Sequence, residues 1–349
     1  MSIIDITVND LALLICSIIA STIMILGGSI GRGKKKKAGF TMISKMPLKE
    51  KIHSFIKGYP GKSLETFKTK FSPDIFGEFK GTWDCIKLGC GGWGCTYLCR
   101  QENKKLVFKV PRGFEEIIEM GIIPTVHEKL LKRIVEESSI LSKICHPHIL
   151  QLIGYLDKIP VLIYEYANYG SLEWQLSKGW KPDFKDILLI GLQIGDALRF
   201  IHSRGLIHGD IKPGNVFIVN GIVKLGDFSS LVKLITLTST HSKFAYTPGF
   251  RAPEQVFSDL RRKAVERGLE NRIDVYQLGN LLLYLLTGAS VDGENVFDVK
   301  RKKEILKEVK NPKLREIIEA MLEPDPERRP SIDEVLKHMF SIYRELAKS

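Results

Sequence analysis

LIHGDIKPGN, residues 206–215, brings a carboxylate, an amine and an amide together in one short segment behind an apolar Leu-Ile pair. Asp210 could accept a hydroxyl proton or orient a nucleophile, and Lys212 could neutralise a phosphoryl group in transfer. Asn215, five residues after the Asp, could offer its carbonyl oxygen to Mg²⁺. A loop of this kind catalyses by placing charge rather than by covalent chemistry.

A second acidic segment, VKLGDF at residues 223–228, follows a short apolar run. Its carboxylate, Asp227, could hold a metal ion that bridges two phosphates. Together the two segments favour metal-assisted phosphoryl transfer. The alternative is a pair of surface turns rich in Asp and Gly, because a motif remains a hypothesis until its structural context is known.

The two segments resemble the catalytic loop and the metal-binding DFG segment of eukaryotic-type protein kinases. The resemblance implies that Asp210, Lys212, Asn215 and Asp227 are the catalytic residues, and that Asn215 and Asp227 hold the metal. It also implies ATP as the nucleotide, with Mg²⁺ or alternatively Mn²⁺ as the metal ion.

Upstream, strand-like runs at residues 83–88, 95–100 and 104–110 surround a GxGxxG segment. The pattern alone is a weak signal. Because it lies between two strands rather than between a strand and a helix, it argues against a dinucleotide fold. It favours a hairpin whose backbone N–H groups cover phosphates.

The resemblance also assigns the nucleotide-binding residues. Lys109, on the strand after the hairpin, would hold the α- and β-phosphates. Glu137, on a helix expected at residues 127–144, would pair with Lys109. Backbone groups of Glu165 and Ala167, in a run that resembles the family's hinge, would hydrogen-bond adenine. The complete set is Gly89, Gly91, Gly94, Thr96, Val107, Lys109, Glu137, Glu165 and Ala167.

Three segments nearer the C-terminus match the family's pattern. TPGFRAPE, residues 247–254, resembles the peptide-positioning loop and APE element of protein kinases, which small-molecule kinases generally lack. Asp274, at the start of a strongly apolar helix, is expected to brace the catalytic loop backbone. Arg329 is expected to pair with Glu254.

The resemblance covers residues 83–346 and implies an α+β, two-lobed kinase fold with the ATP site between the lobes. We expect a small β-rich lobe with one main helix at about 83–166 and a large helical lobe at about 167–346. A transmembrane helix at 11–30 would precede this domain. It would be flanked by a short extracytoplasmic N-terminus at 1–10 and a basic juxtamembrane linker at 31–82.

Residues 11–30 form an uncharged apolar run that, as a helix, is about 30 Å long and could cross a bilayer. No positive n-region precedes the run, so a retained anchor is expected rather than a cleaved signal peptide. Lys34–Lys37 follow and predict a cytoplasmic kinase domain with the N-terminus outside. These lysines could also contact anionic lipids, and the spacing of Gly27 and Gly31 would suit a homodimer.

The net charge of +12 is concentrated in one segment. Residues 31–80 carry 13 Lys and Arg against 4 Asp and Glu, so a nucleic-acid partner is not expected. Four of the six cysteines crowd into residues 85–99. Because they lack CxxC spacing, they are expected to be reduced rather than to bind zinc.

The sequence therefore predicts a membrane-anchored kinase that phosphorylates Ser or Thr of protein substrates, since Lys212 follows the serine/threonine pattern. The alternative is a pseudokinase that binds nucleotide as a membrane-tethered scaffold. Two departures motivate it: Gly209 stands where many members carry Arg, and Ser229 replaces the Gly of the DFG motif. A small-molecule kinase is a third reading, which the 247–254 segment disfavours.

Overall fold

The computed structural model describes residues 83–90, 94–111, 138–156, 161–228, 232–233 and 248–347. The chain divides into two units. The smaller unit contains the described residues up to Cys145 and residues 150–168. The larger unit contains residues 146–149 and the described chain from Tyr169 onward.

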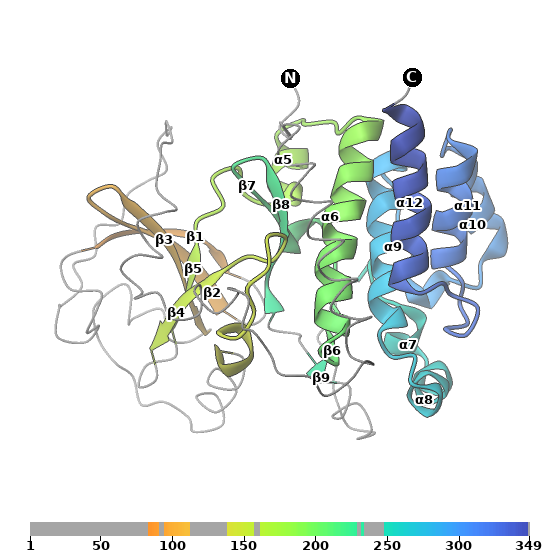
Figure 1. Ribbon diagram of the computed structural model, residues 1–349, viewed down its shortest axis with the longest axis horizontal. Coiled ribbons are helices and arrows are strands. Elements are labelled where there is room, and N and C mark those ends of the chain that lie inside the picture. Colours follow the sequence, from red (N-terminus) through yellow and green to blue (C-terminus); the bar gives the residue numbers. More distant parts are fainter. Residues whose placement is uncertain are drawn as a thin grey trace, which may run out of the picture. The chain divides into compact units, whose positions relative to one another are not determined.

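The smaller unit is built on a five-stranded antiparallel sheet in the order β1-β2-β3-β5-β4 (Figure 1). Its strands are β1 (Asp84–Cys90), β2 (Gly94–Gln101), β3 (Lys104–Pro111), β4 (Leu152–Leu156) and β5 (Val161–Glu165). The three strands predicted between residues 83 and 110 are thus confirmed. Residues 138–141 are helical and fall within the helix predicted at 127–144, the earlier part of which lies outside the described residues.

The alternation of buried and partly exposed residues along β3 explains why this segment forms a strand. Leu106, Phe108 and Val110 are almost fully buried, whereas Val107 and Lys109, which alternate with them, are partly exposed. Successive side chains of a strand point to opposite faces, so a period of two gives the sheet one closed face. Gly94 is required at the start of β2, because a Cβ there would lie 2.2 Å from the carbonyl oxygen of Val110.

The expectation of reduced cysteines is wrong in this structure. Cys85 forms a disulfide with Cys99, and Cys90 forms one with Cys95. The physical reason is the register of the β1–β2 hairpin, which places the members of each pair directly opposite each other. Their Cα atoms are 4.1 Å and 4.0 Å apart. The linear spacing of the cysteines does not reveal this register, which depends on how the two strands pair.

The larger unit is mainly helical. Its long helices α6, α9 and α12 pack together, and α11 contacts α9 and α12 (Figure 1). The helices are α5 (Leu172–Ser177), α6 (Phe184–His202), α7 (Pro253–Val256), α8 (Ser258–Arg267), α9 (Arg272–Thr287), α10 (Val299–Lys307), α11 (Pro312–Met321) and α12 (Ile332–Leu346), with 3₁₀ turns η4 (Pro213–Asn215) and η7 (Gly293–Asn295).

Two glycines of α6 allow the close approach of α12. A Cβ on Gly191 would lie 2.3 Å from the terminal methyl of Met339, and one on Gly195 would lie 2.8 Å from Leu336. Both α6 and α12 begin with a capping box, at Asp183 and Ser331, which satisfies backbone N–H groups that the first turn leaves without partners.

Short strands frame the segment that carries the predicted catalytic residues. β6 (Leu206–Ile207) pairs with β9 (Val232–Lys233), and β7 (Val216–Val219) pairs with β8 (Ile222–Leu225). The predicted catalytic loop, residues 208–215, thus leaves β6 and enters β7 through η4, while Asp227 follows β8.

The predicted pairing of Arg329 with Glu254 is confirmed. Both side chains are fully buried, with Nη1 2.7 Å and Nη2 3.1 Å from the two carboxylate oxygens. Three further contacts, to the carbonyl oxygens of Glu323, Arg272 and Pro324, use the remaining donors of the guanidinium. Such full pairing is what makes a buried charge tolerable.

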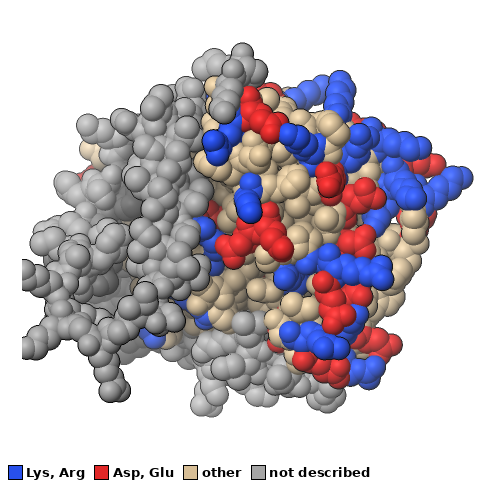
Figure 2. Space-filling model, turned by 45° about the vertical axis from the view of Figure 1, so that its right-hand side comes forward, with Lys and Arg blue, Asp and Glu red and all other residues tan. Residues whose placement is uncertain are grey.

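On the face shown in Figure 2, Lys and Arg side chains lie among Asp and Glu side chains. Among the ion pairs of the described residues, Lys263 is 2.7 Å from Asp325 and 2.8 Å from Glu327. None of the helices in the described part of the chain is long and apolar enough to cross a membrane. The predicted span at 11–30 lies outside that part.

Candidate active site

The three polar residues of the catalytic loop converge on one another. The Lys212 ammonium is 2.8 Å from Oδ2 of Asp210. The Asn215 amide nitrogen donates to the same oxygen at 2.9 Å and to the main-chain oxygen of Asp210 at 2.8 Å. The Asp210 side chain remains 12 % exposed. The loop therefore holds a carboxylate in a fixed direction, beside a cation, at the surface of the larger unit.

Asp274 of α9 braces this loop, as the sequence predicted. Its side chain is fully buried and accepts the backbone N–H groups of His208 at 3.0 Å and Gly209 at 2.8 Å. His202 lies 2.8 Å from the same carboxylate. Burial alone would raise the pKa of Asp274, but hydrogen bonds from His202 and the Gly209 N–H outweigh burial and hold it below its ordinary value.

His208 connects the catalytic loop to the segment that carries Asp227. Its Nε2 is 3.0 Å from the carbonyl oxygen of Gly226, and its Nδ1 accepts the backbone N–H of Asp210 at 3.3 Å. A neutral imidazole protonated on Nε2 satisfies both contacts. The ring also packs edge-on against Phe228, at 5.0 Å between centroids. One buried side chain thus spans the two segments that carry the predicted carboxylates.

Asp227 adopts a backbone conformation that is uncommon outside glycine, with φ at 54°. Residues held in this region cost free energy and cluster at functional sites, although Asp tolerates the conformation better than most. The side chain is partly exposed. Ser229, which replaces the glycine of the family's motif, lies outside the described residues.

The donor set of Asn215 and Asp227 fits a magnesium ion. Both side-chain hydrogen bonds of Asn215 within the described residues use its nitrogen, so its carbonyl oxygen is the atom left for a metal. Mg²⁺ prefers oxygen ligands and is often held by one or two carboxylates plus substrate phosphates rather than by a complete protein cage. The described residues contain no group of three or more His, Cys, Asp and Glu placed to hold a metal.

In the smaller unit, Thr96, Val107 and Lys109 lie on one face of the sheet. Thr96 is the cross-strand partner of Lys109, and Val107 precedes Lys109 by two residues. All three are partly exposed, in contrast to the closed opposite face. The more exposed face of the sheet therefore carries the ammonium group of Lys109 together with the methyl groups of Thr96 and Val107. Gly89 and Gly94 flank the turn of the hairpin, while Gly91 and Glu137 lie outside the described residues.

The predicted hinge residues end strand β5. Glu165 is buried, and its Oε1 accepts the backbone N–H of Gln151 at 2.7 Å, while its own N–H donates to the Gln151 carbonyl at 3.0 Å. This double contact fixes the main chain where β4 begins and β5 ends. Ala167 follows two residues later and is also buried.

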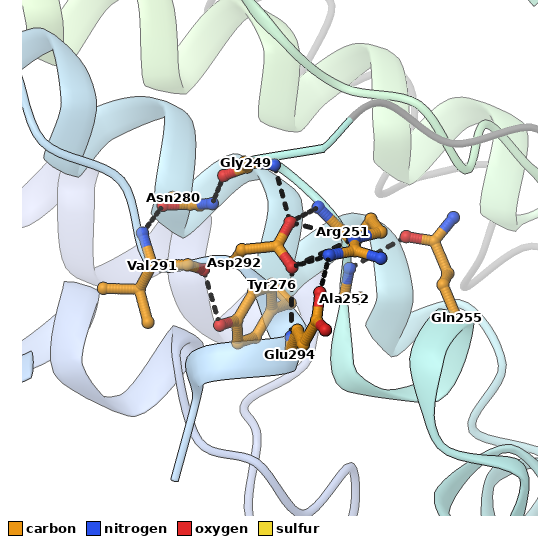
Figure 3. A network of polar contacts seen from close by, with 9 residues as sticks. All are labelled: Gly249, Arg251, Ala252, Gln255, Tyr276, Asn280, Val291, Asp292 and Glu294. Carbon is orange, nitrogen blue, oxygen red and sulfur yellow. Dashed lines mark hydrogen bonds and ion pairs between the residues drawn. The ribbon is translucent and has the colours of Figure 1, made fainter. Parts of the chain in front are cut away.

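The segment predicted to position a peptide substrate is anchored by a carboxylate that the sequence analysis missed. Asp292 accepts the Gly249 N–H at 2.6 Å and the Arg251 guanidinium at 2.6 Å from Nη2 (Figure 3). Glu294 also pairs with Arg251. Burial would raise the pKa of Asp292, but the hydrogen bonds from Arg251 and from the backbone hold it below its usual range. No local pattern links Arg251 to a residue 41 positions away.

Two side chains of α9 also hold the segment at 248–254 and the residue before Asp292 in place. Asn280 donates to the Gly249 carbonyl at 2.9 Å and accepts the Val291 N–H at 2.7 Å, and Tyr276 donates to the Val291 carbonyl at 2.8 Å (Figure 3). A cavity of about 270 Å³ opens here, lined by residues that include Gly249, Arg251 and Asp292. It lies beside the predicted peptide-positioning loop and not at the catalytic loop.

Comparison with known proteins shows that this chain is similar to protein kinases. A family described as "Protein kinase domain" matches residues 84–341. An Aurora kinase of Dictyostelium discoideum is 30% identical over 259 residues, which are 72% of this chain and 63% of that protein. The probable serine/threonine-protein kinase nek3 of the same organism is 30% identical over 72% of this chain and 23% of its own length.

A third relative is mitogen-activated protein kinase kinase kinase 3 of Arabidopsis thaliana. It is 28% identical over 80% of this chain and 44% of its own length. The matched region thus spans less than two thirds of each of these three relatives.

Proposed function

Because the chain belongs to the protein kinase family, we propose that it transfers the γ-phosphoryl group of ATP to Ser or Thr hydroxyls of protein substrates. One observation carries the proposal most directly: Asp210, Lys212 and Asn215 share hydrogen bonds in a single cluster. His208 ties this cluster to the segment that carries Asp227.

Each residue of the cluster has a distinct role in this proposal. Asp210 accepts the proton of the substrate hydroxyl or orients that hydroxyl for attack. Lys212 stabilises the negative charge of the phosphoryl group in transfer, and Asn215 both directs the Asp210 carboxylate and offers its carbonyl oxygen to the metal. Mg²⁺, held by Asn215 and Asp227, would neutralise charge on the phosphates.

The choice of Ser and Thr rests on two supports. Lys212 stands two residues after Asp210, which is the pattern that resembles serine/threonine kinases. In addition, one of the similar proteins is itself named a probable serine/threonine-protein kinase. The well-anchored segment at 248–254 supports a protein substrate, because it presents an ordered main chain for a peptide to contact.

The test is phosphate transfer by the full chain in detergent micelles, with labelled ATP, Mg²⁺ or Mn²⁺, and a generic Ser/Thr protein substrate. We expect labelled phosphoserine or phosphothreonine from the wild type. Asp227→Ala should lower transfer at least about 100-fold, because a metal-bound charge clamp is lost. ATP binding without any transfer by the wild type would instead support the nucleotide-binding scaffold.

We also propose that residues 11–30 anchor the chain in a membrane, with the kinase domain on the cytoplasmic side. The support is the uncharged apolar run and the four lysines at 34–37 that follow it. Contact of these lysines with anionic lipid, and pairing of two chains through Gly27 and Gly31, extend this proposal.

A further inference from the structure

The catalytic loop is held by side chains at each of its backbone N–H groups from His208 to Ile211. Asp274 accepts the first two, and the ring of His208 accepts the N–H of Asp210. The last, from Ile211, goes to Oε1 of Gln277 at 2.9 Å. The direction of the Asp210 side chain therefore depends on which side chains hold the peptide units around it.

Gln277 contacts the peptide units on both sides of Asp210. While its Oε1 accepts the Ile211 N–H, its Nε2 donates to the Gly209 carbonyl at 3.1 Å. These partners fix the orientation of the amide, since an N–H requires the oxygen and a carbonyl requires the nitrogen. Gln277 is 1 % exposed and lies three residues after Asp274, on the same face of α9.

Gln255 of α7 completes this arrangement. Its Nε2 donates to the Gly209 carbonyl at 2.8 Å, and its Oε1 accepts the Gln277 amide at 3.0 Å. The same Oε1 accepts the N–H of Ala252 at 2.8 Å (Figure 3). The two amides thus join the catalytic loop to the end of the segment at 248–254 through a chain of buried hydrogen bonds.

We propose that Gln277 and Gln255 are positioning residues for Asp210: together they fix the peptide units that flank it and link its orientation to the 248–254 segment. This inference rests on the proposed function, in which Asp210 orients or deprotonates the substrate hydroxyl. Gly209 supports this arrangement in a specific way. Its φ of 76° suits glycine, and its carbonyl oxygen receives both amides.

The test separates positioning from stability through the kinetic constants. Gln277→Met keeps the approximate shape of the side chain but removes all of its hydrogen bonds. We expect kcat to fall by about 10- to 100-fold, because small displacements of a catalytic group have effects of this size. The KM for ATP should stay within about twofold, since ATP is bound by other residues.

Gln193→Met is the matched control. Gln193 is also buried, 3 % exposed, and accepts one backbone N–H, from Val223, at 2.8 Å. It lies on α6 and touches none of residues 208–211 through the hydrogen bonds described here. We expect this variant to lose thermal stability but to keep kcat near that of the wild type.

A double-mutant cycle adds a second readout. Because the amides of Gln255 and Gln277 are hydrogen-bonded to each other, the losses of kcat in Gln255→Met and Gln277→Met should not add. Gln255→Met alone should give a smaller fall than Gln277→Met, as the Ile211 contact survives. Should Gln277→Met fail to fold, a several-fold fall in the kcat of folded Gln255→Met supports the inference and an unchanged kcat overturns it.

The outcomes distinguish this inference from the proposed function. No transfer by the wild type contradicts both. If the wild type transfers phosphate while folded Gln277→Met keeps its full kcat, the inference alone is overturned. The same holds if Gln193→Met lowers kcat as strongly as Gln277→Met.

Discussion

His148 makes the stability of the larger unit depend on pH. The residue is 6 % exposed, and its Nδ1 lies 3.1 Å from the carbonyl oxygen of Val223. Burial and, secondarily, the neighbouring His146 lower the pKa of His148 to about 4. The folded protein therefore keeps this imidazole neutral under conditions in which the unfolded chain would protonate it.

The sign of the effect follows from proton linkage. Between about pH 6.5 and pH 4 the unfolded chain binds a proton at His148 that the folded chain does not, so stability falls as the pH falls through this window. The loss should be on the order of 3 kcal/mol. Urea unfolding followed by circular dichroism at several pH values measures it. His148→Gln should flatten this part of the profile; an unchanged slope in that variant contradicts the assignment.

The sequence predicted the role of a residue where that residue belongs to a short local motif. It did not predict contacts between residues that are far apart in the chain, except where the resemblance to protein kinases implied them. The spacing of Asp210, Lys212 and Asn215 is short enough for one loop to bring them together, and the structure does so. The contact of Arg251 with Asp292 joins residues far apart in the chain and left no local signal. Gln277 could have been found, because it shares a face of α9 with Asp274.

At the scale of elements, the β1–β2 hairpin shows what strand-like runs in a sequence do and do not predict. The runs at residues 83–88 and 95–100 predicted both strands. Their register decides which cysteines meet, and it depends on the turn between residues 90 and 94 and on an irregularity between Lys87 and Gly89. A regular hairpin continued from the Cys90–Cys95 pair would place Cys85 opposite Arg100, so the irregularity between Lys87 and Gly89 is what brings Cys85 opposite Cys99.

The two disulfides predict that the hairpin loses stability under reducing conditions. A cross-link that closes a loop of about 15 residues contributes about 3 kcal/mol in the chain-entropy account, and Cys85 and Cys99 are separated by 14 residues. With dithiothreitol we expect amide hydrogen exchange in β1 and β2 to become faster, while exchange in α9 stays unchanged.

One double variant and one single variant sharpen this experiment. Replacing Cys85 and Cys99 by Ser should reproduce part of the effect of the reductant. Cys145, the free cysteine of the described chain, provides the control, since Cys145→Ser should leave hydrogen exchange in the hairpin unaltered. Equal exchange with and without reductant would contradict the pairing.

On the scale of the whole molecule, the sequence predicted two parts of different composition, and both are present: an antiparallel sheet and a helical unit. The division into a β-rich and a helical lobe was implied by the resemblance to protein kinases, and the apolar pattern supported it, because buried strands and amphipathic helices have distinct periods. Residues 1–82 lie outside the described chain, so the membrane anchor and its orientation remain predictions from the sequence.

The proposed orientation and the disulfides can be tested together. Disulfides persist in oxidising compartments and are rare in the cytosol. The disulfides of the structure and a cytoplasmic domain therefore give opposite expectations for cells lysed directly into denaturant with maleimide: the cysteines of a disulfide do not react until a reductant is added, whereas reduced cysteines react at once. Deletion of residues 11–30 should release the chain from membranes washed with alkaline carbonate, whereas the full chain should stay. Cysteines that resist maleimide until a reductant is added would place the domain on the other side.

The central claim is that Asp210 directs the substrate hydroxyl for phosphoryl transfer, and single-turnover kinetics with Asp210→Asn test it most directly. The Asn side chain keeps the shape of the carboxylate but neither accepts the proton nor carries the charge. We expect the transfer rate to fall about 10²- to 10⁴-fold, while the dissociation constant for ATP stays within about twofold. A transfer rate equal to that of the wild type, with folding intact, would contradict the account.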